Sequence, residues 1–134
     1  MNLSEYNTLF GKKKPHKKRE HPEDDLQEAC IKWFDYQYPS LSSMMFHVPN
    51  GGNRNAMEGA RLKKQGVRPG VSDLILLIPR GQFHSCCIEL KSKTGTSSKS
   101  QKAWAKECVK YGNDYNICDN IEDFKFLIDE YLKS

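Results

Sequence analysis

The pattern of apolar and polar positions predicts an amphipathic helix soon after residue 21 and another at the end of the chain. Pro22 is a favoured first helical residue, and Pro39 marks the end of the first helix. The apolar stripe of this helix has the i, i+3, i+4, i+7, i+8 spacing of one face and comprises Leu26, Ala29, Cys30, Trp33 and Phe34. The last helix begins near Asn120, and its buried stripe comprises Ile121, Phe124, Leu127, Ile128, Tyr131 and Leu132.

Shorter apolar runs between these helices predict four strands. Met44–Val48 is a short strand before a turn signal, and Leu74–Ile78 is continuously apolar, as in a central strand covered on both faces. Phe83–Lys91 is a strand with two distinct faces, and Tyr115–Cys118 is a short fourth strand. One face of the third strand carries Cys86, Ile88 and Leu90, and the other carries Ser85, Cys87, Glu89 and Lys91.

Two further helices complete the pattern. The first spans Ala56–Gln65, ends at Gly66 and has a poor apolar stripe dominated by basic residues, which suggests a surface helix that faces a ligand. The second runs from about Ser100 to Tyr111, with Trp104, Cys108 and Tyr111 as its stripe and Gly112 as its end. The resulting order, α-β-α-β-β-α-β-α, predicts an α/β fold with a mixed central sheet flanked by helices.

The 134 residues suffice for one domain, and we place it at 21–134, after a basic flexible tail at 1–20 that holds six Lys or Arg and two acids. No apolar run is long enough to span a bilayer and no secretory signal follows the first charges, so we expect a cytoplasmic protein. The five cysteines form no C-x-x-C pair, and we expect reduced, buried thiols rather than zinc ligands or disulfides.

The charge distribution suggests a polyanion partner, because residues 54–102 hold ten Lys or Arg and only three acids. Backbone amides at Asn50 and the guanidinium of Arg54 suit phosphate, although a tight turn explains the same residues. Further candidate phosphate contacts are Lys63, Lys64, Arg68 and Lys93, and a merely solvated basic face is the alternative. No Gly-rich phosphate loop is present, so no nucleotide cofactor is expected.

The candidate chemistry centres on Asp73, Glu89 and Lys91. Glu89 and Lys91 share one face of a strand, and Asp73 directly precedes another strand. If the two strands are neighbours, the carboxylates converge as a hard cation such as Mg²⁺ requires. Lys91 is then placed to position or deprotonate a water, or to stabilise developing charge. The alternative is a turn-capping Asp73 beside an ordinary Glu89–Lys91 ion pair.

Six motifs between Glu23 and Cys118 bear on this choice. They are E-x-x-x-Q at 23–27, F-H-V-P-N-G at 46–51, L-K-K-Q-G-V-R-P-G-V-S-D-L at 62–74, I-E-L-K at 88–91, S-Q-x-x-W at 100–104 and the helix-closing Gly112. In this order and spacing they resemble the VRR-NUC family of the PD-(D/E)XK nuclease superfamily. One departure is Ser72, where the superfamily pattern has a proline of structural importance.

The resemblance implies a restriction-endonuclease-like core and specific roles. Asp73 and Glu89 resemble the metal-binding acids, with the backbone carbonyl of Leu90 as a further ligand. Lys91 resembles the catalytic lysine, and Gln101 the glutamine beside the site. Glu23 resembles the acid of the first helix.

Several of these assignments have alternatives. Gln101 also fits a capping box with Ser98, and both roles are compatible. The alternative for Glu23 is that it only favours the helix macrodipole, and Asp24 and Glu28 compete with it for the inward position. His47, before the Asn50–Gly51 turn, is expected to be a surface or core histidine rather than a catalyst.

The expected function is therefore a Mg²⁺- or Mn²⁺-dependent DNA endonuclease. The resemblance to stand-alone, phage-type VRR-NUC proteins further implies a homodimer that acts on branched or junction DNA, in the host cytoplasm if the gene is viral. Alternatives are a noncatalytic nucleic-acid-binding module that keeps the fold, and an adaptor whose basic tail binds an acidic partner.

Overall fold

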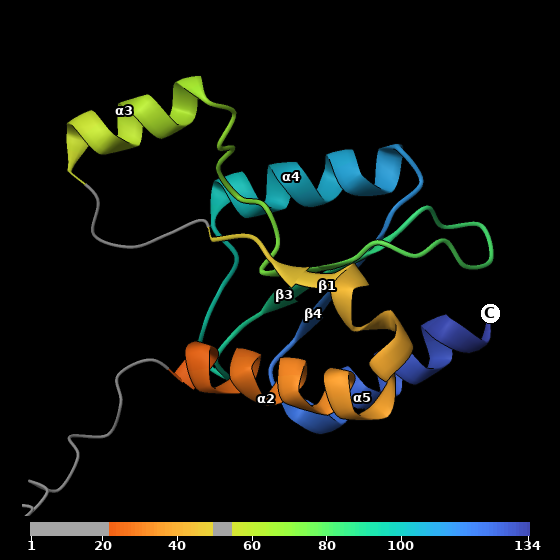
Figure 1. Cartoon of the computed structure of the whole chain (residues 1–134). Helices are drawn as coiled ribbons and strands as arrows, with labels where there is room; N and C mark the ends of the chain where they lie inside the picture. Colours follow the sequence, from red (N-terminus) through yellow and green to blue (C-terminus); the bar gives the residue numbers. More distant parts are fainter. Residues whose placement is uncertain (1–21, 50–54) are drawn as a thin grey trace, which may run out of the picture.

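A computed structural model describes residues 22–49 and 55–134 of the chain (Figure 1). Its elements are, in order, α2 (Pro22–Gln37), the 3₁₀ helix η1 (Pro39–Met44), β1 (Met45–His47), α3 (Ala56–Lys64), β2 (Leu74–Leu76), β3 (Cys86–Leu90), α4 (Lys99–Lys110), β4 (Asp114–Cys118) and α5 (Ile121–Lys133). The predicted α-β-α-β-β-α-β-α order is confirmed, with η1 added to it. The predicted tail at 1–20, together with Asn50 and Arg54, lies outside the described residues.

The four strands form one mixed sheet in the order β1-β2-β3-β4. β1 and β3 both pair with β2 in antiparallel fashion, whereas β4 pairs with β3 in parallel, as the intervening helix α4 allows. Leu74 lies opposite Ile88, so the next residues along the two strands, Asp73 and Glu89, are also opposite one another. The predicted adjacency of their strands is therefore confirmed.

Helices α2 and α5 cover one face of the sheet, and α4 covers the other (Figure 1). The main core lies between the sheet and the α2–α5 layer; its buried side chains are Cys30, Phe34, Met45, Leu74, Leu76, Ile78, Cys86, Ile88, Leu90, Cys118, Phe124, Ile128 and Tyr131. Each large apolar side chain buried there contributes about 1.5–3 kcal/mol. The ring of Trp33 on α2 meets Phe124 on α5 edge to face at 5.9 Å, and Tyr38 donates a hydrogen bond to Asp129.

Three predicted positions of burial are wrong. Leu77 is 55% exposed, because β2 ends at Leu76 and α4 covers β4 rather than this part of the sheet. Tyr111 is 64% exposed, because α4 ends one residue earlier and the chain then turns at Gly112, which has a φ of +83°. Ala29 is exposed at the margin of the buried face of α2. The first three strands are also shorter than the apolar runs that predicted them.

The surface character predicted for α3 is confirmed, since none of its nine residues is buried. Asn55 caps its first turn by accepting a hydrogen bond from the backbone N–H of Glu58. All five cysteines are buried free thiols, as expected. Within 22–49 and 55–134, no helix has the length and apolar character needed to cross a membrane.

Candidate active site

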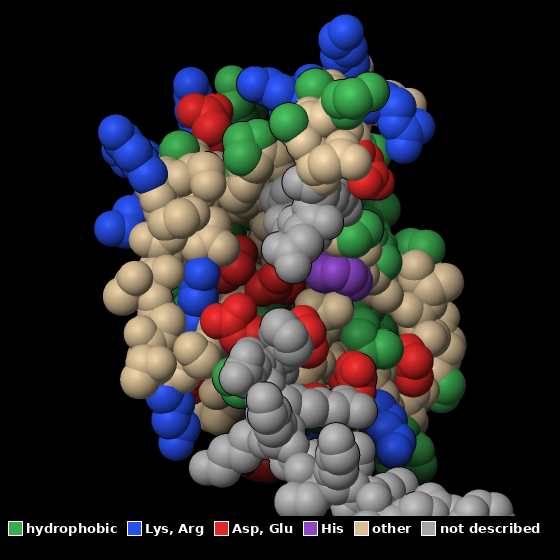
Figure 2. All heavy atoms as spheres, turned by 90° about the vertical axis from the view of Figure 1, so that its left-hand side faces the viewer, with side chains coloured by type: hydrophobic (Ala, Val, Ile, Leu, Met, Phe, Trp, Pro, Cys, Tyr) green, Lys and Arg blue, Asp and Glu red, His purple; other side chains and the backbone are tan. Residues whose placement is uncertain are grey.

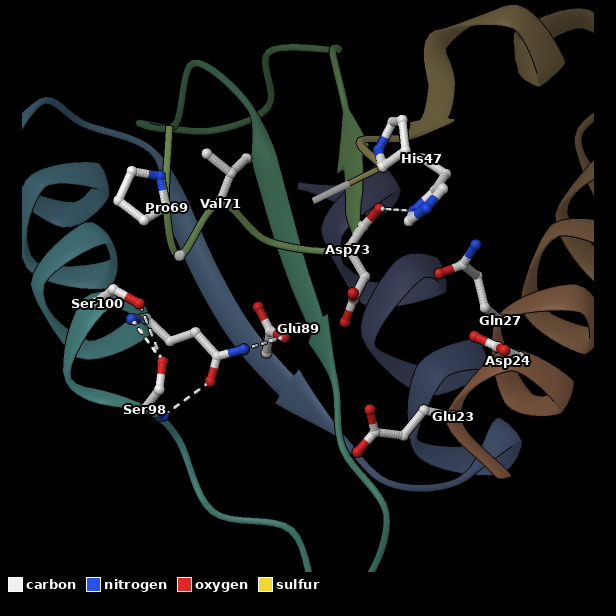
Figure 3. Close-up of a pocket in the computed structure, with 13 residues that line it drawn as sticks. Glu23, Asp24, Gln27, His47, Pro69, Val71, Asp73, Glu89, Ser98 and Ser100 are labelled. Atoms are coloured by element: carbon white, nitrogen blue, oxygen red, sulfur yellow. Dashed lines mark hydrogen bonds between the residues drawn. The ribbon is translucent and has the colours of Figure 1, made fainter. Parts of the chain in front are cut away.

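A pocket of about 690 Å³ opens where α2 and α4 both begin (Figures 2 and 3). It lies at the end of the sheet reached by the start of β2 and the end of β3. Its lining residues are Glu23, Asp24, Gln27, His47, Pro49, Pro69, Gly70, Val71, Asp73, Glu89, Ser98, Ser100 and Gln101. Acidic side chains gather at its centre, and Lys and Arg side chains lie above it over α3 (Figure 2).

Asp73 and Glu89 face one another inside this pocket (Figure 3). Asp73 is fixed by the backbone N–H of Leu90, which donates a hydrogen bond of 2.8 Å to its Oδ2. Glu89 projects from β3 on the side of the sheet that α4 covers and accepts a hydrogen bond of 3.0 Å at Oε1 from Gln101 Nε2. The cross-strand register therefore produces the pair of convergent carboxylates that the sequence predicted.

Glu89 is buried in an unusual electrostatic setting, with 2% of its surface exposed. Its Oε2 atom is buried and has no hydrogen-bond partner in the described part of the chain. Burial, and then the neighbouring Asp73 carboxylate, raises the pKa of Glu89 from 4.5 to about 8, while Lys91 acts in the opposite direction. A buried carboxylate in this state requires either a proton or a cation.

Gln101 connects Lys91 to Glu89 through hydrogen bonds. Lys91 Nζ donates a hydrogen bond of 2.6 Å to Gln101 Oε1 and lies 4.0 Å from Glu89 Oε1. The same Gln101 oxygen accepts from the backbone N–H of Ser98, and Ser98 Oγ accepts from the Gln101 N–H. The two roles foreseen for Gln101, capping α4 and bordering the site, are therefore both present.

The first turn of α2 forms the opposite wall of the pocket. Glu23 accepts a hydrogen bond of 3.1 Å from the backbone N–H of Ser92, which follows β3 closely. Asp24 also lines the pocket, whereas Glu28 is exposed and does not. Gln27, one helical turn after Glu23, is a lining residue that carried no role in the sequence prediction, although the E-x-x-x-Q spacing already placed it on the same face.

His47 belongs to this group as well. Its Nδ1 lies 2.7 Å from the backbone carbonyl oxygen of Asp73, and its ring lines the pocket (Figure 3). The backbone N–H of Val48 donates to the same oxygen, so the end of β1 holds the residue that precedes β2. Ser72, at the position of the expected proline, is fully buried and donates to the carbonyl oxygen of Leu74.

The loop before Asp73 is pressed against the start of α4. Gly70 has a φ of +79°, and a Cβ atom there would lie 2.3 Å from the backbone oxygen of Ser100. Only glycine, which has no Cβ atom, fits this close contact between the Gly70 and Ser100 backbones. The contact joins the segment that carries Asp73 to the helix that carries Gln101, and nothing in the local sequence predicted it.

The predicted phosphate contacts lie outside the pocket. Lys63 and Lys64 are exposed in the last turn of α3, Arg68 is exposed in the following loop, and Lys93 is exposed after β3. The structure thus places acids inside the pocket and bases on the surface around it. A polyanion reaching the pocket would meet the basic side chains of the surrounding surface.

The donor set suits a hard cation that retains water ligands. Among residues 22–49 and 55–134, no cluster of three or more His, Cys, Asp or Glu side chains forms a complete cage for a metal ion. Mg²⁺ is commonly bound by only one or two carboxylates, with water and phosphate oxygens as its other ligands. Asp73 and the unpartnered Oε2 of Glu89 meet that requirement.

A mixed sheet flanked by helices, with two acids and a lysine at the ends of adjacent strands, defines a nuclease-type fold. The VRR-NUC domain model matches residues 21–120, and the chain belongs to this family. A solved structure named "VRR_NUC domain protein" is similar with a TM-score of 0.73 and 28% identity, over 84% of this chain and 88% of that chain. Comparison with curated proteins gave no match.

Proposed function

We propose that this protein is a divalent-metal-dependent endonuclease that hydrolyses phosphodiester bonds in DNA. The observation that carries the proposal is the buried, unpartnered Oε2 of Glu89, which faces Asp73 and lies beside the Lys91–Gln101 pair. A structural ion pair would leave no buried carboxylate oxygen unsatisfied, because such an atom costs about 1–3 kcal/mol or more.

The groups that would hold Mg²⁺ or Mn²⁺ are the carboxylates of Asp73 and Glu89 and the backbone carbonyl of Leu90. The bound ion would lower the pKa of a water molecule and neutralise charge on the scissile phosphate. The chain itself fixes the orientation of the acids, since Asp73 is held by the Leu90 N–H and Glu89 by Gln101. This preorganisation avoids reorganising the acids during the reaction.

Lys91 acts as a hydrogen-bond donor to the reacting groups. One of its three N–H bonds is directed to Gln101 Oε1, which leaves two to orient water or to stabilise charge developing on the phosphate. Gln101 positions this ammonium, and Glu23 completes the opposite wall of the site through its contact with Ser92. These assignments give each predicted catalytic residue a distinct task.

The substrate in this proposal is duplex or branched DNA. The exposed Lys63, Lys64, Arg68 and Lys93 supply phosphate contacts, and we include the sequence candidates Asn50 and Arg54 among them. One site cuts one strand, so symmetric cleavage of a junction calls for a homodimer. We place this activity in the cytoplasm, that of the host if the gene is viral.

Cleavage assays test the proposal directly. The purified protein is incubated with a nicked plasmid, a linear duplex and a four-way junction, each with Mg²⁺, Mn²⁺ or EDTA. We expect cleavage only with metal, and we expect Lys91→Ala to lose it by at least about 100-fold. Lys125→Ala, on α5 and paired with Glu122, is the matched control and should retain full activity.

A different result would favour the noncatalytic alternative. If the wild-type protein binds these DNAs tightly but cuts none of them with either metal, the nuclease proposal is wrong. The protein would then be a binding module that keeps the fold. Preference among the three substrates would identify the DNA structure recognised.

A further inference from the structure

Helix α3 stands apart from the rest of the molecule (Figure 1). None of its residues is buried, and within the described chain it makes no substantial packing contact with another helix or strand. A nine-residue helix is marginal in water by itself, even with the Asn55 cap. Its persistence as a separate element above the pocket therefore needs an explanation other than core packing.

The two sides of α3 differ in composition. Leu62 and Gly59 are its partly buried residues and mark the inner side. At 100° per residue, the side directly opposite carries Met57, Ala60, Arg61 and Lys64. Met57 is 85% exposed, so this outer face presents an apolar side chain between cations.

The charges of this outer face are not neutralised locally. Within the described part of the chain, neither Arg61 nor Lys64 has a carboxylate at ion-pair distance, although Glu58 lies one turn before Arg61. By contrast, Lys125 and Lys133 on α5 lie 3.4 and 3.2 Å from Glu122 and Glu130. Cations held beside an acidic pocket draw an anionic polymer toward it. Ala60, on the same side of the helix, is small and permits close approach of a ligand.

We propose that the outer face of α3 is a duplex-binding surface, seated in the major groove next to the phosphate that enters the pocket. This inference rests on the proposed nuclease function and names the surface that binds the double-stranded part of its DNA substrate. A nine-residue helix is about 13 Å long and 10–12 Å wide with its side chains, and the major groove is about 12 Å wide. Arg61 and Lys64 contact the phosphates, and Met57 lies against the base edges.

Binding and cleavage by a charge-removing variant test this surface. Arg61→Ala/Lys64→Ala is compared with Lys125→Ala/Lys133→Ala, which removes the same charge from α5. Fluorescence anisotropy in EDTA at 50–200 mM salt measures binding to a labelled 20-base-pair duplex and to a single strand of equal length. Arg61, Lys64 and Lys133 are exposed and Lys125 is partly exposed, and far-UV circular dichroism verifies the folded state.

We expect the α3 variant to bind duplex at least about tenfold more weakly, with a salt dependence shallower by about two counterions, and the α5 variant to match the wild type. With Mg²⁺, KM should rise while kcat stays unchanged.

Equal duplex affinity of the two variants overturns the inference and leaves the nuclease proposal standing. Equal losses on single strand and duplex overturn the duplex assignment. A dimer that becomes monomeric in the α3 variant, by light scattering, shows that a second copy occupies this face instead. A wild type that neither binds nor cleaves DNA removes both proposals.

Discussion

Replacing Glu89 by glutamine should stabilise the metal-free protein while abolishing its proposed activity. Glu89 is buried, its Oε2 lacks a partner among the described residues, and it faces the Asp73 carboxylate. A glutamine has nearly the same shape, keeps an oxygen for Gln101 Nε2 and offers an N–H to Asp73. The substitution removes the desolvated charge without leaving a cavity.

The size and pH dependence of this effect follow from the raised pKa. Because the folded-state pKa of Glu89 is about 8 and its ordinary value is 4.5, the native state binds a proton more tightly than the unfolded state does. The resulting stabilisation is complete below about pH 4.5 and is lost as the pH rises through 8. One pKa unit corresponds to about 1.4 kcal/mol, which caps the effect near 5 kcal/mol. Since Lys91 and Gln101 partly solvate the charged form, we expect about 1–3 kcal/mol at pH 9.

Urea unfolding in EDTA at pH 5, 7 and 9, followed by tryptophan fluorescence, measures this effect. The free energies of unfolding of the wild type and of Glu89→Gln should differ least at pH 5 and most at pH 9. Glu107→Gln, an exposed carboxylate on α4, is the control and should follow the wild type at each pH. Parallel pH profiles for wild type and Glu89→Gln would refute the account of a buried, uncompensated carboxylate. Added Mg²⁺ should stabilise only proteins that retain Glu89.

Further substitutions address the supports of the site. Gly70→Ala should lower the free energy of unfolding by at least about 2 kcal/mol in a thermal-unfolding experiment, because Gly70 has a positive φ and the added Cβ would lie 2.3 Å from the backbone oxygen of Ser100. Gly59→Ala, whose Cβ meets nothing within 4 Å, should stabilise α3 by about 0.5–1 kcal/mol. Equal effects of the two alanines would contradict the close approach. Ser98→Ala should remove only the N-cap of α4, which lowers the free energy of unfolding by about 1 kcal/mol, and should leave cleavage largely unchanged. Gln101→Ala keeps that cap, because its backbone N–H still donates to Ser98 Oγ, and loses the reciprocal bond from the Ser98 N–H. It should also reduce kcat by at least about tenfold, because Lys91 loses its acceptor; comparable kcat values in both variants would disprove that positioning role.

The order and type of the elements could be predicted because the apolar periodicities of this chain are clear. The heptad-like spacing from Leu26 to Phe34 and from Ile121 to Leu132 depends only on local geometry. The 3₁₀ helix η1 was missed because Pro39–Met44 has no apolar periodicity. The exposure of Leu77 was missed for a different reason, since it depends on which part of the sheet α4 covers.

The centre of the site was predictable from strand geometry, whereas the wall residues Glu23 and Gln101 were expected only from the family resemblance. Glu89 and Lys91 share a face by the two-residue period of a strand, and the pairing of their strand with that of Asp73 requires only a hairpin connection. The contact of Glu23 with Ser92 joins residues 69 positions apart. The contact of His47 with Asp73 spans 26 positions. Such distant contacts arise from the packing of whole elements, which no local pattern encodes.

The packing of α2 on α5 has a consequence for the protein during its synthesis. α2 carries Glu23 and is made before every other described element, but Phe124, on which its Trp33 packs, lies on α5, the last of these elements. Until α5 has left the ribosome, α2 has its contacts with η1 and β3 but lacks those with α5, so the pocket wall that it carries is only partly supported. A ribosome-bound chain without α5 therefore has Asp73, Glu89 and Lys91 beside a wall that is only partly supported, and this support is completed after translation has passed α5.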